Sequence, residues 1–204
     1  MPLCSERHPH LKQTDPEIYN LIQKQIQAES TTLKMIPSEN FAPFAVLEAS
    51  GSILTNKYCE GYSGARYYEG NEVMDEIESL AVARAKALFG AEHANVQPYS
   101  GSPANQAVYR ALAHLGDKIM GIPVPLGGHL THGWGVNFSG SDYLQVPYGP
   151  RVETGMLDYD EIRDIALKNR PRMIWVGGTS YPRFFDYQKF AEIAAEIDAY
   201  VVAD

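Results

Sequence analysis

The chain has 204 residues, of which 25 are acidic and 17 basic, so its formal net charge is −8. Hydrophobic residues make up 45% and charged residues 21%, which is ordinary for a globular protein that buries one sizeable core. The sequence has no basic stripe, which argues against a nucleic-acid partner, and no run of about 18 apolar residues that would cross a membrane.

The start of the chain is polar. Residues 1–14 carry charges of both signs and lack the apolar centre of a secretory signal. Cys4 and Cys59 do not have the spacing of metal ligands, and we expect reduced thiols rather than a disulfide. These observations together predict a cytoplasmic protein.

An N-terminal arm with a helix is predicted for residues 1–35. Asp15, Pro16 and Glu17 supply a cap, a proline and an acidic first turn, which together indicate a helix start. The apolar side chains that share one face of this helix are Ile18, Leu21, Ile22 and Ile26. Residues 36–204 are then expected to form the main domain.

The segment after the arm is less regular. An extended stretch ends near Asn40, and a short helix is predicted from about Pro43 to Ser50. Residues 55–71 are rich in glycine, tyrosine and charge. Either they form an ordered surface that lines a site, since loops often carry function, or they form an exposed loop that is merely aromatic.

From about residue 72 onward, helical and extended patterns alternate. Helices are expected at about 72–89, 103–115, 158–169 and 186–198, and strands at 118–121, 142–148, 173–176 and 200–203. This alternation predicts an α/β domain with a largely parallel sheet and helices on both faces. Ligands of such sheets bind at the carboxyl ends of the strands.

The stretch around Ser100, Gly101 and Ser102 would lie at such an end. An apolar run up to Val96 predicts a short strand, and Pro103 suits the first position of the helix that follows. Free N–H groups at the positive end of that helix, flanked by two hydroxyls, can bind phosphate. The alternative is a helix start that is simply capped by Ser102.

Two histidines and an aspartate lie at other strand ends. His129 and His132 are three residues apart in a glycine-flanked loop, but no third ligand has suitable spacing, so we predict no metal site. A histidine ring in such a loop is better suited to stack on a planar ligand. Asp204 closes a buried-type strand, where a carboxylate needs a cation, unless it caps a following helix. A phosphate cup, a stacking imidazole and a buried carboxylate are together what pyridoxal phosphate requires.

Longer motifs carry a family resemblance. They are PSENF at 37–41, LTNKY at 54–58, EGY at 60–62, RYY at 66–68, GAEHANVQP at 90–98, GGHLTHG at 127–133, NFSG at 137–140 and VPYG at 146–149. From about residue 15 to its end, the sequence resembles serine hydroxymethyltransferase, a pyridoxal-phosphate enzyme of fold type I. The resemblance implies that residues 36–204 are the N-terminal part of the family's large α/β domain.

The resemblance also implies a cofactor site. Its members would be Ser100, Gly101, Ser102, His129, Thr179 and Asp204. The first three would hold the phosphate, and His129 would stack on the pyridine ring. Asp204 would pair with the ring nitrogen. Thr179 stands where the family has a serine that bonds to the ring oxygen.

Catalytic and substrate roles follow from the same resemblance. Ser38 and Tyr68 would bind the amino-acid substrate. Glu60 would exchange a proton near the serine hydroxyl, which a carboxyl group can do. Tyr58, Tyr68 and His129 would complete the catalytic set. Tyr58, Glu60 and Tyr68 would reach into the site of a neighbouring subunit, which implies a homodimer or tetramer.

The implied reaction is the reversible interconversion of serine and glycine with tetrahydrofolate as one-carbon carrier. The folate would contact Glu60, Val124, Gly128, His129 and Leu130. Two alternatives stay open: a folate-independent β-hydroxy amino acid aldolase of the same fold, and a non-catalytic truncated half-protein.

Five positions depart from the usual family pattern. Tyr99 and Leu126 stand where histidine is usual, Pro103 replaces glutamine, Glu69 replaces glycine, and Val124 replaces leucine near the folate. Pro103 removes one N–H donor from the helix start.

The lysine that binds the cofactor covalently in this family would lie beyond Asp204. None of the eight lysines of the chain is in the threonine-rich motif that precedes it. We therefore expect the chain to be the N-terminal half of a longer enzyme, without the small C-terminal domain, and to be inactive by itself.

Overall fold

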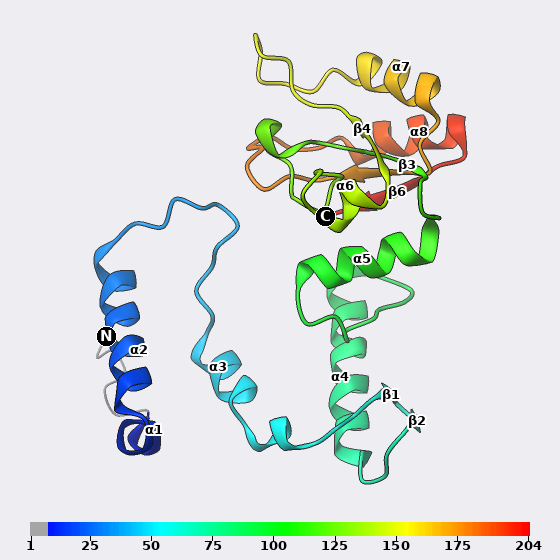
Figure 1. The fold of residues 1–204 in the computed structure, drawn as a ribbon. Helices are drawn as coiled ribbons and strands as arrows, with labels where there is room; N and C mark the ends of the chain where they lie inside the picture. Colours follow the sequence, from blue (N-terminus) through cyan, green and yellow to red (C-terminus); the bar gives the residue numbers. More distant parts are fainter. Residues whose placement is uncertain (1–7) are drawn as a thin grey trace. The chain divides into compact units, whose positions relative to one another are not determined.

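Two helices begin the part of the chain that the computed structural model describes, residues 8–204 (Figure 1). These are α1 (Pro9–Thr14) and α2 (Pro16–Thr31). The Asp15 side chain caps α2 by accepting a hydrogen bond from the Ile18 N–H at 3.0 Å, so the predicted helix start is confirmed. Both helices belong to a first compact unit that ends at Phe41, and Ala42–Asp204 form a second unit.

The second unit opens with short elements and one long helix. They are α3 (Phe44–Ser50), the 3₁₀ helix η1 (Ile53–Asn56), the antiparallel pair β1 (Gly61–Tyr62) and β2 (Ala65–Arg66), and α4 (Glu72–Phe89). Gly90 ends α4 in the left-handed conformation with φ 63°, which glycine adopts at little cost. The predicted helices at about 43–50 and 72–89 are thus confirmed, whereas the glycine- and tyrosine-rich segment contains a small hairpin.

A four-stranded parallel sheet forms the centre of the second unit. Its strands are β3 (Lys118–Gly121), β4 (Leu144–Pro147), β5 (Met173–Val176) and β6 (Tyr200–Ala203), in the order β4-β3-β5-β6. In the register, Lys118 pairs with Leu144, and Met173 pairs with Tyr200. β4 is shorter than predicted because Asp142 closes the short helix α6 (Phe138–Ser141), its N–H donating to the Phe138 carbonyl.

Helices cover both faces of this sheet, as the sequence predicted (Figure 1). On one face, α7 (Tyr159–Asn169) and α8 (Tyr187–Ile197) pack against residues such as Ile174 and Val176. On the other face, Tyr109 of α5 (Gly101–Leu112) packs with Trp175. Successive strand residues point to opposite faces, so β5 is buried along its whole length.

The helix caps on the α7–α8 face follow the sequence closely. The Asp158 carboxylate accepts from the N–H groups of Asp160 and Glu161, and Asp186 accepts from the Lys189 N–H. The hydrogen bond from the Glu161 N–H holds the pKa of Asp158 below its ordinary value. Both predicted caps are confirmed.

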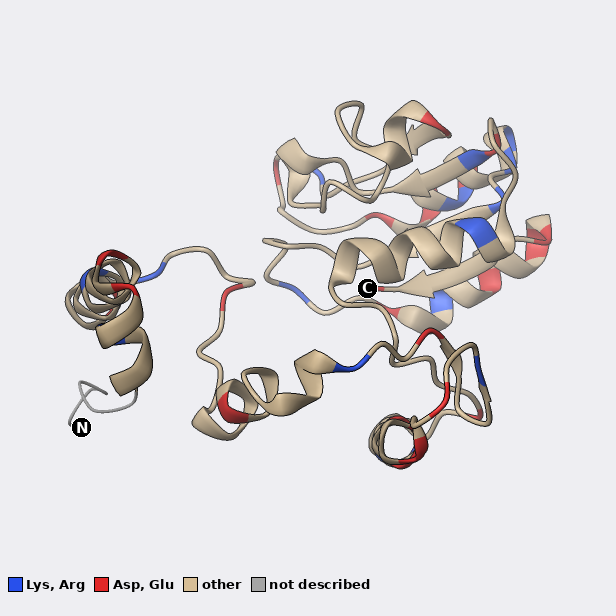
Figure 2. Cartoon of the chain, turned by 60° about the horizontal axis from the view of Figure 1, so that its bottom comes forward, with Lys and Arg blue, Asp and Glu red and all other residues tan. Residues whose placement is uncertain are grey.

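Three further findings concern charge, membrane-spanning helices and cysteines. Acidic and basic residues are interspersed along the described residues (Figure 2). No helix within residues 8–204 is long and apolar enough to cross a membrane. Cys59 is an exposed free thiol, whereas Cys4 and the rest of residues 1–7 lie outside the described part of the chain.

Candidate functional site

The carboxyl ends of β3 and β5 mark the position of the candidate site. From β3 the chain moves to β4 on one side, and from β5 it moves to β6 on the other, so the loops that follow these two strands diverge at a topological switch point. The two loops touch there, because the Ser180 N–H donates to the Gly127 carbonyl at 3.1 Å. Open α/β sheets bind ligands at such points.

Asp204 stands at the carboxyl end of β6. Its N–H donates to the Val176 carbonyl at 3.0 Å, which extends the pairing with β5. Its Oδ2 accepts hydrogen bonds from His132 Nε2 at 2.7 Å and from Asn105 Nδ2 at 3.0 Å. The bond from His132 holds the pKa of Asp204 below its ordinary value despite the opposing effect of burial, and the bond from Asn105 adds to it. The carboxylate is therefore ionised at neutral pH.

The His129 ring is oriented by a second set of bonds. Its Nδ1 accepts from the Thr131 N–H at 3.2 Å and lies 2.8 Å from Thr131 Oγ1. Asn105 Nδ2 donates to that same hydroxyl oxygen at 2.7 Å, and Tyr109 Oη donates to the Thr131 carbonyl at 2.7 Å. The fully buried Thr131 thus joins His129 to α5, and through Asn105 to Asp204.

The site therefore contains three residues whose roles the sequence analysis missed: Asn105, Thr131 and His132. His132 was considered there only as a metal ligand. The buried residues of α5 are Asn105 and Tyr109, which are one turn apart and therefore lie on the same face of the helix. The sequence signal for this buried face was a polar residue, Asn105, four positions before a large aromatic residue, Tyr109.

The start of α5 differs from the prediction in three respects. Residues 91–100 form a loop rather than a strand. Ser100 is the N-cap, so Ser102 is not the cap, and Pro103 is the third helical residue rather than the first. The first intrahelical bond runs from the Ala104 N–H to the Ser100 carbonyl at 3.2 Å. Because the Ser100 side chain makes no capping bond, its hydroxyl is not used by the helix.

The predicted phosphate-binding residues lie at this helix start. Ser100, Gly101 and Ser102 are all exposed, and the first N–H groups of a helix have no intrahelical partner. Pro103 removes one of these donors even at the third position. The three predicted phosphate-binding residues are therefore exposed at the positive end of α5.

The other predicted cofactor and folate residues lie on the two loops at the switch point. Gly128 is buried so tightly that a Cβ there would lie 1.7 Å from the Ile122 carbonyl oxygen. Val124 and Leu130 are 37% and 43% exposed, leaving apolar surface on the loop that follows β3. Thr179 is half-buried in the loop after β5.

Tyr58, Glu60 and Tyr68 lie on or beside the β1–β2 hairpin. The rings of Tyr58 and Tyr68 are 6.3 Å apart, and their residues are 76% and 52% exposed. Glu60 is also exposed, and its carbonyl accepts from the Tyr67 N–H at 3.1 Å. The hairpin therefore brings the three predicted catalytic residues to one exposed segment.

Arg66 holds this segment in place, a role that the sequence analysis missed. Its Nη1 donates to the carbonyls of Cys59 and Gly61, which flank Glu60, at 2.7 and 2.9 Å. Its other nitrogens pair with Asp75 and Glu78 of α4. The hydrogen bond from the Gly64 N–H and that from Arg66 hold the pKa of Asp75 below its ordinary value.

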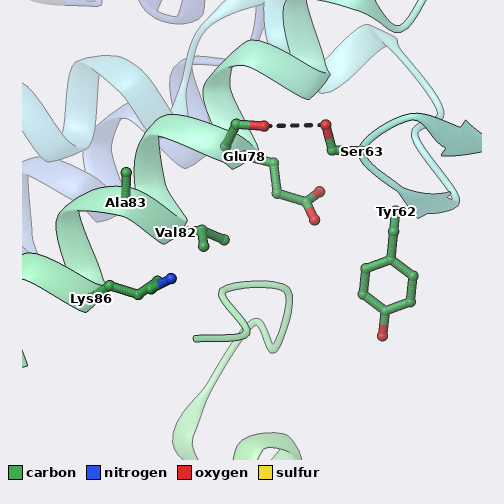
Figure 3. A pocket seen from close by; sticks show the side chains of 7 residues that line it. Tyr62, Ser63, Glu78, Val82, Ala83 and Lys86 are labelled. Atoms are coloured by element: carbon green, nitrogen blue, oxygen red, sulfur yellow. Dashed lines mark hydrogen bonds between the residues drawn. The ribbon is translucent and has the colours of Figure 1, made fainter. Parts of the chain in front are cut away.

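An open hollow of about 360 Å³ lies between the hairpin and α4 (Figure 3). Tyr62 and Ser63 line it from the hairpin, and Glu78 and Lys86 line it from α4. Ser63 and Ser79 both line it, and their hydroxyl oxygens are 3.2 Å apart. None of the predicted site residues lines this hollow.

The predicted residues thus fall into separate groups. One group surrounds Asp204 and His129, and another lies on the hairpin; no hydrogen bond or ring contact within residues 8–204 joins the two. Ser38 lies in a turn of the first unit. Among the described residues, no three His, Cys, Asp or Glu side chains are grouped so as to hold a metal ion.

Comparison with known proteins adds to this geometry. Residues 11–204 match the family described as serine hydroxymethyltransferase. The chain is 64% identical over 194 residues to serine hydroxymethyltransferase 2 of Mesorhizobium japonicum, a match that covers 95% of the chain and 44% of that relative. It is 54% and 53% identical to the serine hydroxymethyltransferases of Acidothermus cellulolyticus and Sorangium cellulosum, covering 45% and 46% of them. The chain therefore spans less than half the length of these relatives.

Proposed function

Because the chain belongs to the serine hydroxymethyltransferase family, we propose that the protein built on it interconverts serine and glycine, with pyridoxal phosphate as cofactor and tetrahydrofolate as one-carbon carrier. Its fold is the α/β fold of the type I pyridoxal-phosphate enzymes, with a parallel sheet and an N-terminal helical segment. The observation that carries the proposal is the ionised Asp204 carboxylate, held at a strand end where His129 is also oriented.

The residues present suit pyridoxal phosphate. Ser100, Gly101 and Ser102 offer hydroxyls and N–H groups at a helix start, which suits a phosphate. An Asp204 carboxylate with a lowered pKa suits a protonated ring nitrogen, and His129 offers a flat ring to stack on the pyridine. Thr179 would donate its hydroxyl to the ring oxygen. When bound, the cofactor supplies an electron sink for cleavage of a bond in the substrate.

The hairpin residues would act on the substrate. Glu60 would take up and return the proton of the serine hydroxyl, and Tyr58 and Tyr68 would line the same space. Their exposure, together with the anchoring of the hairpin by Arg66, supports presentation of this segment to the site of a second copy. We therefore propose a homodimer or tetramer with shared sites, in which Ser38 and Tyr68 bind the substrate.

The folate would lie over the loop that follows β3. Val124 and Leu130 present half-exposed apolar side chains there, and such surface suits the flat ring of a folate. Gly128, His129 and Glu60 would complete that contact.

We further propose residues 1–35 as the arm, residues 36–204 as part of the large domain, and a cytoplasmic location.

An absorbance titration of the chain with pyridoxal phosphate tests the cofactor site. Asp204→Asn removes the charge but keeps the size of the side chain, so we expect binding to weaken by roughly tenfold or more, the worth of one charge-assisted hydrogen bond. Asp198→Asn is the matched control, because Asp198 occupies the left-handed conformation that asparagine also tolerates. Equal affinity of Asp204→Asn and the unmodified chain would contradict the assignment.

A second experiment tests the reaction itself. A protein that joins this chain to the remaining half of a relative should convert serine to glycine only when tetrahydrofolate is present. Cleavage of β-hydroxy amino acids that needs no folate would favour the aldolase alternative instead.

A further inference from the structure

Hydrogen-bond direction assigns the protons of the buried His132 ring. The His129 N–H donates to His132 Nδ1 at 3.4 Å, so Nδ1 must present a lone pair. The proton of the ring is then on Nε2, which lies 2.7 Å from Asp204 Oδ2. An imidazolium would set a second N–H against the backbone donor. These bond directions are those of the neutral Nε2–H tautomer.

The second donor to Asp204 is neutral as well. Asn105 Nδ2 carries two hydrogens and has two acceptors, Thr131 Oγ1 and Asp204 Oδ2. The Thr131 N–H donates to His129 Nδ1, so this nitrogen also accepts, and the Thr131 hydroxyl must donate to it. Asn105 therefore donates both to the Thr131 hydroxyl and to Asp204, and the Thr131 hydroxyl donates to His129 Nδ1.

Packing prevents the His132 ring from turning away. Its side chain is 1% exposed, and its ring stacks on Trp175 with centroids 5.5 Å apart and planes 21° apart. Trp175 stacks in turn on Tyr109 of α5. A Cβ on Gly121 would lie 3.1 Å from His132 Cβ, so glycine at the end of β3 allows this close approach.

We propose that His132 and Asn105 are positioning residues for Asp204: two neutral donors hold one carboxylate oxygen and leave the full negative charge for a cationic ring nitrogen. Among residues 8–204, both side-chain donors end at Oδ2, and none ends at Oδ1. A positively charged donor in the same place would pair with the carboxylate itself. It would also repel the cationic ring nitrogen, because like charges repel. The inference rests on the proposed function for the identity of that cation.

NMR of the ligand-free 204-residue chain tests the tautomer directly. Long-range ¹H–¹⁵N correlations should show a protonated Nε2 and an unprotonated Nδ1 for His132 at neutral pH. A proton on Nδ1, or on both nitrogens, would overturn the proposal. This measurement needs no substitution, so it holds even if a variant fails to fold.

Two substitutions separate the N–H donor from the ring stack. His132→Phe keeps an aromatic ring on Trp175 but has no donor, whereas His132→Gln keeps a neutral N–H donor without the ring. A ¹³C titration of the Asp204 carboxyl group should give a higher pKa in His132→Phe and retain the lowered pKa in His132→Gln. If His132 acts only through its stack on Trp175, His132→Gln should change the pKa of Asp204 more than His132→Phe does. An unchanged pKa in His132→Phe would overturn the proposal.

Cofactor affinity supplies a further measurement. In the absorbance titration, His132→Phe should weaken pyridoxal phosphate binding roughly ten- to a hundredfold, while His132→Gln and the control His93→Gln on an exposed loop stay within about threefold. Equal weakening by Phe and Gln would overturn the positioning role. If the unmodified chain binds no pyridoxal phosphate, the proposed function fails, whereas the NMR results still decide how Asp204 is held.

Discussion

Replacing Tyr109 by phenylalanine removes a single oxygen from the centre of the candidate site. Tyr109 is fully buried, and its hydroxyl donates to the Thr131 carbonyl at 2.7 Å. Its ring stacks on Trp175 at 5.0 Å and packs edge-on against Phe138. Phenylalanine can keep these ring contacts, so the substitution isolates the hydrogen bond that ties α5 to the His129 loop.

The expected cost follows from that bond. The substitution leaves the Thr131 carbonyl without the Tyr109 hydroxyl. Leaving a buried acceptor without its donor costs about 1–3 kcal/mol. No large cavity forms, because the ring remains. We therefore expect Tyr109→Phe to lower the free energy of unfolding by about 1–3 kcal/mol.

Urea unfolding followed by tryptophan fluorescence measures this cost. The midpoint should fall while the slope stays unchanged. Tyr148→Phe should lose a similar amount, because the Tyr148 hydroxyl donates to the Trp175 carbonyl at 2.7 Å. Tyr143 packs on Tyr109, but its hydroxyl makes no hydrogen bond among the described residues, so Tyr143→Phe should change stability by only about 0.5 kcal/mol. The reasoning is refuted if Tyr109→Phe and Tyr143→Phe behave alike.

Two further predictions use the same urea assay. Burial raises the pKa of Tyr109 and of Tyr148 above the ordinary value of about 10. The stability that this provides is complete below about pH 10 and decreases as the pH rises above it, because the folded chain holds these protons more tightly. The double phenylalanine variant should therefore lose less stability in alkali, and parallel losses would count against the prediction. Gly128→Ala places a Cβ against a main-chain carbonyl and should cost about 1–3 kcal/mol or more, whereas Gly135→Ala meets nothing within 4 Å and should be nearly neutral; equal midpoints would show that the loop relaxes.

Much of the secondary structure was predictable because its signals are local. Asp15, Asp158 and Asp186 each cap the helix that begins at the next residue, and Gly90 ends α4. A cap acts within one helical turn, so the sequence next to it contains the whole interaction. The strand prediction failed before Ser100, where a few apolar residues in a loop lack the period that separates strand from coil.

The candidate site was predictable only in part. His129 and Asp204 were recognised through the family motifs and through their places at strand ends. Asn105, Thr131 and His132 were missed because their partners are distant in sequence: Asn105 and Thr131 are 26 residues apart, and His132 and Asp204 are 72 apart. No local pattern marks a hydrogen bond of that span.

The sequence by itself determined the family, the alternation of helices and strands, and which segments end in polar residues. These properties depend on residue identity and on the short-range periodicity of apolar residues, and both can be read locally from the sequence. Only the tertiary structure decided which face of α5 is buried, and that Asn105 and His132 share one oxygen of Asp204. The physical reason is that the sheet order β4-β3-β5-β6 brings together loops from distant parts of the chain, where buried polar groups such as Asn105, Thr131 and His132 find their partners.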